Sequence, residues 1–301
     1  MKIYHVDDHK IIQDDVILAL RGKEIPNESV DLIFADPPYN IGKNYNGNMD
    51  KWKNDKTYIS WCKKWIGLAI KKLKPNGSLY IMTATQFMPY IDLYLGGKMH
   101  IASRIVWHYD SSGVQATKAF GSLYEPILHC VKSKNSYVFN SKAIQIDTKT
   151  GAKRKLIDYR KTPPEKYNTK KVPGNVWVFS RVRYRMSEYE NHPTQKPRHL
   201  MERIIKASSN KNNVVLDLFA GTFTTGETAK LLGRKSISIE KDSEYVKIGL
   251  RRVLGMKQLD GVKLAQKKKP YKQKNGVFAE KKAKEKANTK AAKKAVLLNS
   301  K

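Results

Sequence analysis

The residues with the clearest chemical potential are Asp36-Pro37-Pro38-Tyr39, which directly follow the apolar run 30–35. The Asp36 carboxylate and the Pro37 carbonyl can accept the two hydrogens of an exocyclic amine, such as the N6 amine of adenine. Such an amine is a poor nucleophile because its lone pair is delocalised into the ring, and two acceptors turn that lone pair toward an electrophile. Because the two prolines fix backbone dihedrals, the carbonyl is held in place. The four residues are therefore the predicted catalytic element.

Tyr39 adds an aromatic ring that can stack on a base outside the duplex. Enzymes that modify a base need such base flipping, since the target atom is otherwise buried within the stack. An ordinary Asp-Pro-Pro turn after a strand is the competing interpretation. The aromatic fourth residue and the apolar strand before the turn favour the catalytic one.

A second element is the run 216–221 (LDLFAG), which joins a predicted strand to a predicted helix. Turns of this kind bring the backbone close to a ligand at the carboxyl edge of a parallel sheet. Glu240 ends the next predicted strand, 23 residues after Asp217, where an acid can bind the ribose hydroxyls of a nucleoside cofactor. From these residues alone, an ordinary α/β turn that binds no ligand is an equally good interpretation. The candidate cofactor-binding residues here are Asp217, Phe219, Ala220, Gly221, Thr222 and Glu240.

A third element is the loop 192–197 (HPTQKP), which sets small polar groups and a cation between prolines. Thr194 and Lys196 are its candidate cofactor ligands, for the amino acid end of the molecule. Taken alone, the segment is an ordinary loop before a helix.

Strands and helices must alternate to position these groups. Helices are predicted at 58–73, 200–208, 225–232 and 243–254. Strands are predicted at 30–35, 78–82, 101–107, 127–131, 213–218 and 236–239. The alternation indicates an α/β fold with a mainly parallel sheet and helices on both faces.

The composition changes twice along the chain. Residues 132–190 are polar, basic and rich in aromatic side chains, and Lys153 and Arg154 lie among them. This segment is the predicted target-recognition region, inserted between catalytic segments 1–131 and 191–255. Residues 256–301 hold 15 lysines, no arginine and three acidic residues, and are predicted to be a disordered tail because few apolar side chains are present to drive packing.

Arg181, Arg183 and Arg185 alternate along the chain. In a strand this spacing would put three guanidinium groups on one side, where they can contact phosphates or guanine edges. A solvated strand face is an equally good interpretation. They are nevertheless the candidate DNA-binding residues, together with Lys153 and Arg154.

The overall charge favours a polyanionic partner. Lys and Arg number 58 against 27 Asp and Glu, a formal net charge of +31, and each phosphate that a cation neutralises releases a counterion. The two cysteines have no metal-binding spacing, so no metal site is predicted. There is no signal peptide and no apolar run of membrane-spanning length. We therefore expect no membrane partner and a cytoplasmic protein.

The order of these elements resembles the β-class of DNA amino-methyltransferases. The catalytic tetrapeptide comes first, followed by the recognition region, the loop 192–197 and the run 216–221, and the resemblance covers nearly all of residues 1–255. It implies a Rossmann-like S-adenosylmethionine-dependent methyltransferase fold with a mixed, mainly parallel seven-stranded sheet. It also implies methyl transfer to N6 of a flipped adenine in double-stranded DNA, by an enzyme of the kind found in restriction-modification systems.

The resemblance assigns individual roles as well. It implies that Phe219 lies against the methionine part of the cofactor and that Glu240 binds the ribose. Further runs, YEPIL and KVPGNVW among them, are similar to a group of bacterial orphan adenine methyltransferases and suggest ATGCAT as the target. β-class enzymes are often dimers, which suits a palindromic site. The sequence does not indicate whether a partner nuclease exists.

The chain departs from the family at one position. Many relatives have a second glycine where this chain has Phe223. A bulky side chain there must point away from the cofactor, or else the loop must run differently.

Other functions fit less well. C5-cytosine methylation needs a cysteine nucleophile, normally after a proline, but Cys62 follows Trp61 and Cys130 follows His129. A nicotinamide dehydrogenase would carry GxGxxG after its first strand, and the chain has none. Cytosine-N4 methylation uses the same amine chemistry and stays open, although its tetrapeptide more often begins with Ser. RNA methylation also stays open, whereas a non-catalytic basic DNA-binding protein would leave Asp36 and Glu240 unexplained.

Overall fold

The computed structural model describes residues 1–109, 118, 120–148, 156–256, 265–266 and 296–299. Within these residues the main sheet has eleven strands, in the order β13-β7-β8-β6-β3-β14-β15-β2-β1-β17-β16. Their bounds are β1 Lys2–Val6, β2 His9–Gln13, β3 Val30–Ala35, β6 Leu73–Met82, β7 His100–His108, β8 Tyr124–Val131, β13 Val176–Val178, β14 Val214–Asp217, β15 Lys235–Glu240, β16 Ala265–Gln266 and β17 Val296–Asn299.

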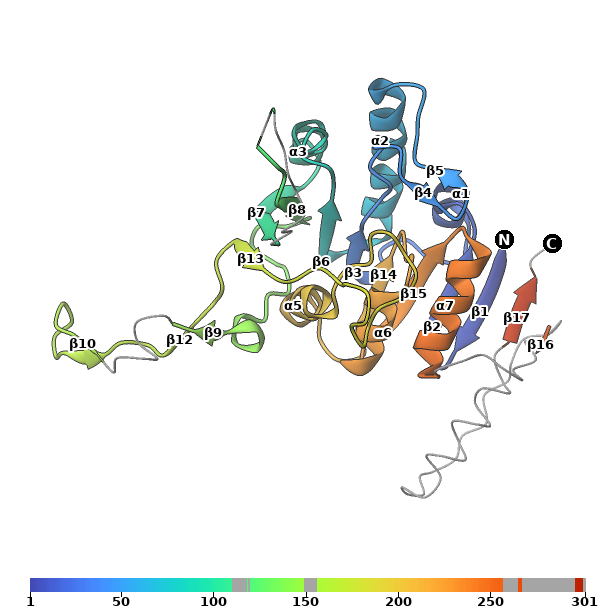
Figure 1. The fold of residues 1–301 in the computed structure, drawn as a ribbon. Coiled ribbons are helices and arrows are strands. Elements are labelled where there is room, and N and C mark those ends of the chain that lie inside the picture. Colours follow the sequence, from blue (N-terminus) through green and yellow to red (C-terminus); the bar gives the residue numbers. More distant parts are fainter. Residues whose placement is uncertain (110–117, 119, 149–155, 257–264, 267–295, 300–301) are drawn as a thin grey trace, which may run out of the picture.

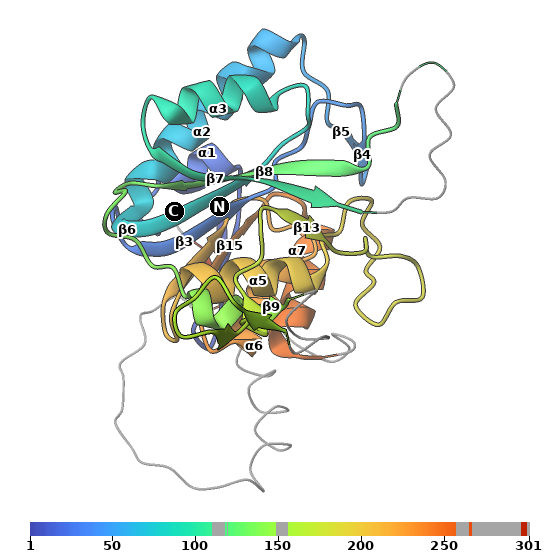
Figure 2. The same cartoon turned by 90° about the vertical axis from the view of Figure 1, so that its left-hand side faces the viewer.

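The centre of the sheet is parallel. Strands β6, β3, β14, β15 and β2 pair in parallel with one another, while β8 and β1 run antiparallel to their neighbours. Figure 2 shows the helices in two layers, with α1, α2 and α3 over one face and α5, α6 and α7 over the other. Their bounds are α1 Val16–Arg21, α2 Asp55–Lys72, α3 Met88–Gly96, α5 Arg198–Ser208, α6 Thr224–Leu231 and α7 Ser243–Leu254.

Apolar spacing accounts for this arrangement. Every residue of β3 except Asp31 is buried, as expected for a central parallel strand covered on both faces. Along α2, Tyr58, Cys62, Trp65 and Ala69 recur at helical intervals and are buried against the sheet. The core therefore lies between the sheet and each helical layer, and it leaves the carboxyl ends of the parallel strands at one edge.

The predicted α/β fold is confirmed, and each predicted strand and helix is present with bounds that shift by up to three residues, except that β6 begins five residues before the predicted strand 78–82. The sheet is larger than the seven strands that the family resemblance implies. β13 extends one edge, and the short strands β17 and β16 extend the other next to β1. These two strands differ from the predicted disorder of the tail, most of which lies outside the described residues. No described helix combines the length and apolar character that a bilayer crossing requires.

The segment between β8 and α5 projects from the body, as the green and yellow part of Figure 1 shows. It contains the two-stranded pairs β9 (Ile146–Asp147) with β12 (Lys170–Lys171) and β10 (Ile157–Asp158) with β11 (Glu165–Lys166). The chain then returns to the main sheet through β13, which pairs in parallel with β7.

The strand that would align Arg181, Arg183 and Arg185 on one side is not formed. Residues 181–185 have no strand, and the chain turns where the Met186 N–H donates to the Arg183 carbonyl at 3.1 Å. Arg185 has φ of +72°, a left-handed conformation that breaks the side-to-side alternation of a strand. The three guanidinium groups therefore do not share one strand face.

Candidate active site at the carboxyl edge of the sheet

The three chemical elements of the sequence meet in one pocket at the carboxyl edge of the sheet. Asp36 follows β3, Asp217 ends β14, and the loop 192–197 precedes α5. The pocket is lined by Phe34, Asp36, His192, Thr194, Gln195, Lys196, Asp217, Phe219, Ala220, Gly221, Thr222, Thr224 and Thr225. Eight candidate residues from the sequence are thus brought together, although they span most of the chain.

Asp36 is held by a ring of polar side chains from three elements. Its Oδ2 lies 2.7 Å from Lys196 Nζ, and its Oδ1 accepts a hydrogen bond from the Tyr39 hydroxyl at 2.6 Å. Glu125, at the start of β8, closes the ring at 3.4 Å from Lys196 Nζ and 3.0 Å from the Tyr39 oxygen. Pro37 is buried within the turn and Pro38 partly so.

Electrostatics fix the protonation of the two donors in this ring. Burial alone would lower the pKa of Lys196, but the carboxylates of Asp36 and Glu125 outweigh it and raise that pKa. Burial, followed by the same two carboxylates, holds the pKa of Tyr39 well above its ordinary value. Lys196 is therefore an ammonium and Tyr39 a neutral phenol at physiological pH.

Side chains beyond the tetrapeptide hold its backbone. The buried Asp50 carboxylate accepts hydrogen bonds from the N–H of Tyr39, at 3.1 Å, and from the N–H of Lys43. The Tyr58 hydroxyl donates to the Pro38 carbonyl at 2.9 Å. Sequence reasoning missed Asp50 and Glu125. Only Glu125 left a signal, as a charged residue that immediately precedes Pro126 and a run of buried apolar residues.

The loop after β14 passes close to His192, at a glycine. Gly221 has φ of +49°, and a Cβ there would lie 3.1 Å from His192 Nε2. Glu240 accepts hydrogen bonds from the N–H groups of Gly221 and Asp242, both at 2.8 Å. Burial raises the pKa of Glu240 to about 7. Burial also raises the pKa of Asp217 to about 7.

Phe219 is fixed by two tryptophans of α2. Its ring centroid lies 5.8 Å from that of Trp61 and 5.2 Å from that of Trp65. One side of the ring thus packs on the helical layer, and the residue also lines the pocket. The tryptophans act as packing residues that position an aromatic wall.

Phe223 points away from the pocket, which resolves the departure from the family pattern. It begins α6 in a left-handed conformation with φ of +60°, and its fully buried ring packs with Val246, Leu250 and Val253. Gly249 makes the space, since a Cβ on that residue would lie 2.4 Å from the ring. The bulky side chain at position 223 therefore does not enter the pocket.

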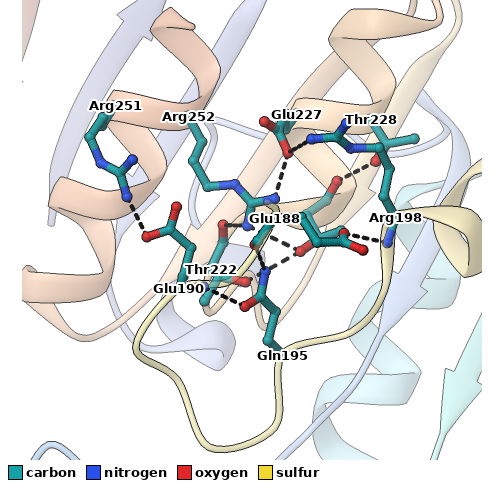
Figure 3. A network of polar contacts seen from close by, with 10 residues as sticks. Glu188, Glu190, Gln195, Arg198, Thr222, Glu227, Thr228, Arg251 and Arg252 are labelled. Atoms are coloured by element: carbon teal, nitrogen blue, oxygen red, sulfur yellow. Dashed lines mark hydrogen bonds and ion pairs between the residues drawn. The ribbon is translucent and has the colours of Figure 1, made fainter. Parts of the chain in front are cut away.

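A polar network ties the loop 188–198 to α6 and α7 (Figure 3). The Arg252 guanidinium is buried and donates to the Thr222 carbonyl at 2.6 Å and to Glu227. Glu227 also accepts from Arg198 at 3.3 Å. Gln195 is held by its own loop, because its amide donates to the Glu188 carbonyl and accepts from the Glu190 N–H. The loop 188–198 and the loop after β14 are thereby held by the same helices.

The candidate DNA-binding residues divide into three groups. Arg181 lines a second pocket with Trp107, Glu125 and the loop 192–196, and stacks over the Tyr109 ring at 4.8 Å. Arg183 and Arg185 are exposed on the neighbouring turn. Lys153 and Arg154 lie outside the described residues. Among the residues that the structure does describe, no cluster of three or more His, Cys, Asp or Glu side chains is arranged for a metal.

Comparison with known proteins places this pocket in a family. A family model described as DNA methylase matches residues 30–251. The chain is 57% identical over 259 residues to the DNA adenine methyltransferase YhdJ of Escherichia coli (strain K12). The aligned residues cover 86% of this chain and 87% of that protein. It is 34% identical to the type II methyltransferase M.HpaI of Haemophilus parainfluenzae, over 82% of this chain and 74% of that one.

Solved structures agree. The complex of M1.HpyAVI with S-adenosylmethionine superposes with a TM-score of 0.57 at 26% identity, covering 81% of this chain and 98% of that one. The cytosine-N4-specific PvuII DNA methyltransferase has a TM-score of 0.61 over 82% of this chain and 86% of its own, and its 19% identity supports the fold alone. The Rossmann-like methyltransferase fold and the family predicted from the motif order are confirmed: the chain belongs to the DNA methylase family of N6 and N4 methyltransferases.

Proposed function

We propose that this chain transfers a methyl group from S-adenosylmethionine to the N6 amine of an adenine in double-stranded DNA. The observation that carries the proposal is the single pocket in which Asp36 of the tetrapeptide faces the loops 192–196 and 217–225. The similarity to an adenine methyltransferase over most of both chains supports adenine as the base. Cytosine N4 is the alternative, because its amine would meet the same two acceptors.

The pocket fits the cofactor. Gly221 lines the pocket with backbone alone, beside the His192 ring, and Phe219 offers an apolar face for the methionine part. Glu240, already fixed by two backbone N–H groups, has further lone pairs for ribose hydroxyls. Thr194 lines the same pocket. Bound there, the cofactor would supply a methyl group on a sulfonium, which is an activated leaving group.

The residues of the chain then act on the adenine. Asp36 and the Pro37 carbonyl accept the two N6 hydrogens, which turns the lone pair of the amine out of the ring plane and toward the pocket. Tyr39 stacks on the flipped base. Lys196 holds Asp36 in place through the 2.7 Å ion pair, so the carboxylate is oriented before the substrate arrives.

Segments 1–131 and 191–255 form the catalytic domain in this proposal, and 132–190 the target-recognition region. The projecting arm carries exposed cations and aromatic rings, as a surface that contacts phosphates and bases requires. The Lys-rich residues 256–301 add non-specific affinity for DNA. We propose ATGCAT as the target, a homodimer that matches its two-fold symmetry, and association with the nucleoid when DNA is bound.

The proposal is tested by incubating the protein with tritiated S-adenosylmethionine and a duplex that contains one ATGCAT, then digesting the DNA and separating the nucleosides. We expect the label in N6-methyl-2′-deoxyadenosine, and none with Asp36→Ala. A matched duplex in which the site is scrambled tests the target sequence separately. Label in N4-methylcytosine would overturn the base, and label in RNA or protein alone would overturn the substrate.

The affinity of the protein for a nucleoside that carries the cofactor's ribose is expected to rise with pH between 6 and 8. The pKa of Glu240 is about 7, and the ionised carboxylate is the better acceptor for ribose hydroxyls, so binding strengthens as the proton leaves. One hydrogen bond corresponds to about threefold to tenfold in affinity. Calorimetry with 5′-methylthioadenosine measures it, since this probe keeps the ribose and lacks the titrating amino group. Glu240→Gln should reduce the pH dependence to the part that Asp217 contributes, since the pKa of Asp217 is also about 7, and a slope as steep as that of the unchanged protein would contradict the assignment.

Arg183→Ala is expected to weaken DNA binding without changing cofactor affinity. Its exposed guanidinium lies on the turn beside the second pocket, so each lost phosphate contact lowers affinity by roughly threefold to tenfold and flattens the salt dependence. Fluorescence anisotropy with labelled duplex at several salt concentrations measures both. Lys71→Ala is the control, because Lys71 is an exposed cation at the end of α2 on the opposite edge of the sheet. Equal DNA affinity of the Arg183 variant and the unchanged protein would refute the prediction.

A further inference from the structure

Glu125 has no role in the chemistry described so far, although it touches two residues of the active site. It lies at the start of β8, and its side chain is only 17% exposed. Its Oε2 is 3.4 Å from Lys196 Nζ and 3.0 Å from the Tyr39 hydroxyl oxygen. A carboxylate is costly to bury unless it is paired, so its place beside Asp36 requires a reason.

The hydrogen count in the ring gives that reason. The Lys196 ammonium has three N–H groups, and three acceptors lie near it: Asp36, Glu125 and the Thr194 carbonyl at 3.3 Å. Tyr39 has a single O–H group, yet its oxygen is within hydrogen-bond distance of both carboxylates. It donates to Asp36 Oδ1 at 2.6 Å or to Glu125 Oε2 at 3.0 Å, and never to both at once.

Asp36 gains a second, competing donor when the substrate arrives. If Asp36 accepts an N6 hydrogen of adenine, as in the proposed function on which this inference rests, the Tyr39 hydrogen competes for the same carboxylate. Without a second acceptor, the buried phenol and the amine would share one carboxylate that Lys196 also contacts, and each hydrogen bond would be weakened. Glu125 lies where that second acceptor is needed.

We propose that Glu125 is a positioning residue that takes over the Tyr39 hydroxyl when Asp36 turns to the adenine amine. Rotation of the O–H bond carries the hydrogen from one carboxylate to the other, and no covalent bond forms or breaks. Lys196 bridges the two carboxylates throughout and keeps them apart. The raised pKa of Tyr39 agrees with this role, because burial and the two carboxylates keep the phenol protonated as a donor.

The test is a double-mutant cycle of Glu125→Gln and Tyr39→Phe, read as single-turnover methyl transfer to duplex DNA. We expect Glu125→Gln to slow transfer about tenfold in the unchanged background and by less than about twofold when Tyr39 is already Phe. Dissociation constants for S-adenosylmethionine and for DNA should change less than about twofold, since Glu125 contacts Tyr39 and Lys196 and the glutamine keeps an acceptor oxygen for the ammonium.

Several outcomes would overturn the inference. Undiminished transfer by Glu125→Gln would do so, as would equal losses in the two backgrounds, which a merely structural ion pair would give. Should Glu125→Gln fail to fold, Glu125→Asp keeps the charge and is read in the same cycle. Failure of the proposed function is distinguishable, because the unchanged protein would then place no label on adenine.

Discussion

Lys196→Met is expected to lose at least about a hundredfold in methyl transfer and about 3 kcal/mol in the free energy of unfolding. The ammonium is 7% exposed and pairs with Asp36 and Glu125, whose side chains are 14% and 17% exposed. Without it, two buried carboxylates would share one phenol hydrogen. One of them must then take up a proton or move toward water, and either change removes the oriented acceptor for the adenine amine. Single-turnover kinetics and urea unfolding measure the two losses.

Two further variants distinguish the loss of the Lys196 ion pairs from the general effect of removing a cation. Lys43→Met removes a half-buried cation of the same region that has no comparable ion pair with Asp36, and we expect its unfolding free energy to change by less than about 1 kcal/mol. Adding Glu125→Gln to Lys196→Met should restore part of the lost stability, since one uncompensated charge disappears. A Lys196→Met protein as stable as the original would refute the argument.

This role of Lys196 is additional to the one that the sequence suggests. The loop 192–197 predicts a ligand for the amino acid end of the cofactor, whereas the structure gives the ammonium three acceptors within the protein. The additional role is missed because Asp36 and Glu125 are distant in the chain from Lys196 and nothing in its immediate sequence indicates them. Thr194 keeps its predicted position on the wall of the pocket.

The sequence predicts well what depends on local order. The turn at 36–39, the glycine at 221 and the acid at 240 each follow a strand, and parallel strands bring their carboxyl ends to one edge. The fold, the family and S-adenosylmethionine as cofactor follow from this order, and the comparisons support all three.

The sequence predicts poorly what depends on tertiary contacts. Asp50 resembles any loop acid until its carboxylate is seen beneath the Tyr39 N–H. Arg252 stands among basic residues of α7, and only its burial next to Thr222 reveals it as a support of the cofactor loop. The alternation at 181–185 is misleading for a similar reason, because a single left-handed residue, Arg185, breaks a pattern that assumes extended backbone.

Phe223 and Gly249 form a matched pair whose disruption should cost the most stability outside the catalytic ring. Gly249→Ala is expected to destabilise the protein by about 2 kcal/mol, because the new Cβ would lie 2.4 Å from a fully buried ring that has no room to move. In a helix with free space, the same change should stabilise by up to about 1 kcal/mol. Gly67→Ala in α2 is the control, since its Cβ meets only the Tyr94 hydroxyl oxygen at 3.4 Å.

Replacing Phe223 by the glycine of the family pattern is expected to turn the destabilising effect of Gly249→Ala into a stabilising one. Phe223→Gly removes a buried ring, at about 3 kcal/mol, and relieves a left-handed phenylalanine worth about 1 kcal/mol. In this background Gly249→Ala should stabilise, because its methyl group enters the space that the ring leaves. Urea unfolding of the four proteins measures the coupling, and cofactor affinity should stay within about twofold because the ring points away from the pocket. Equal effects of Gly249→Ala in both backgrounds would show that Phe223 does not fill this space.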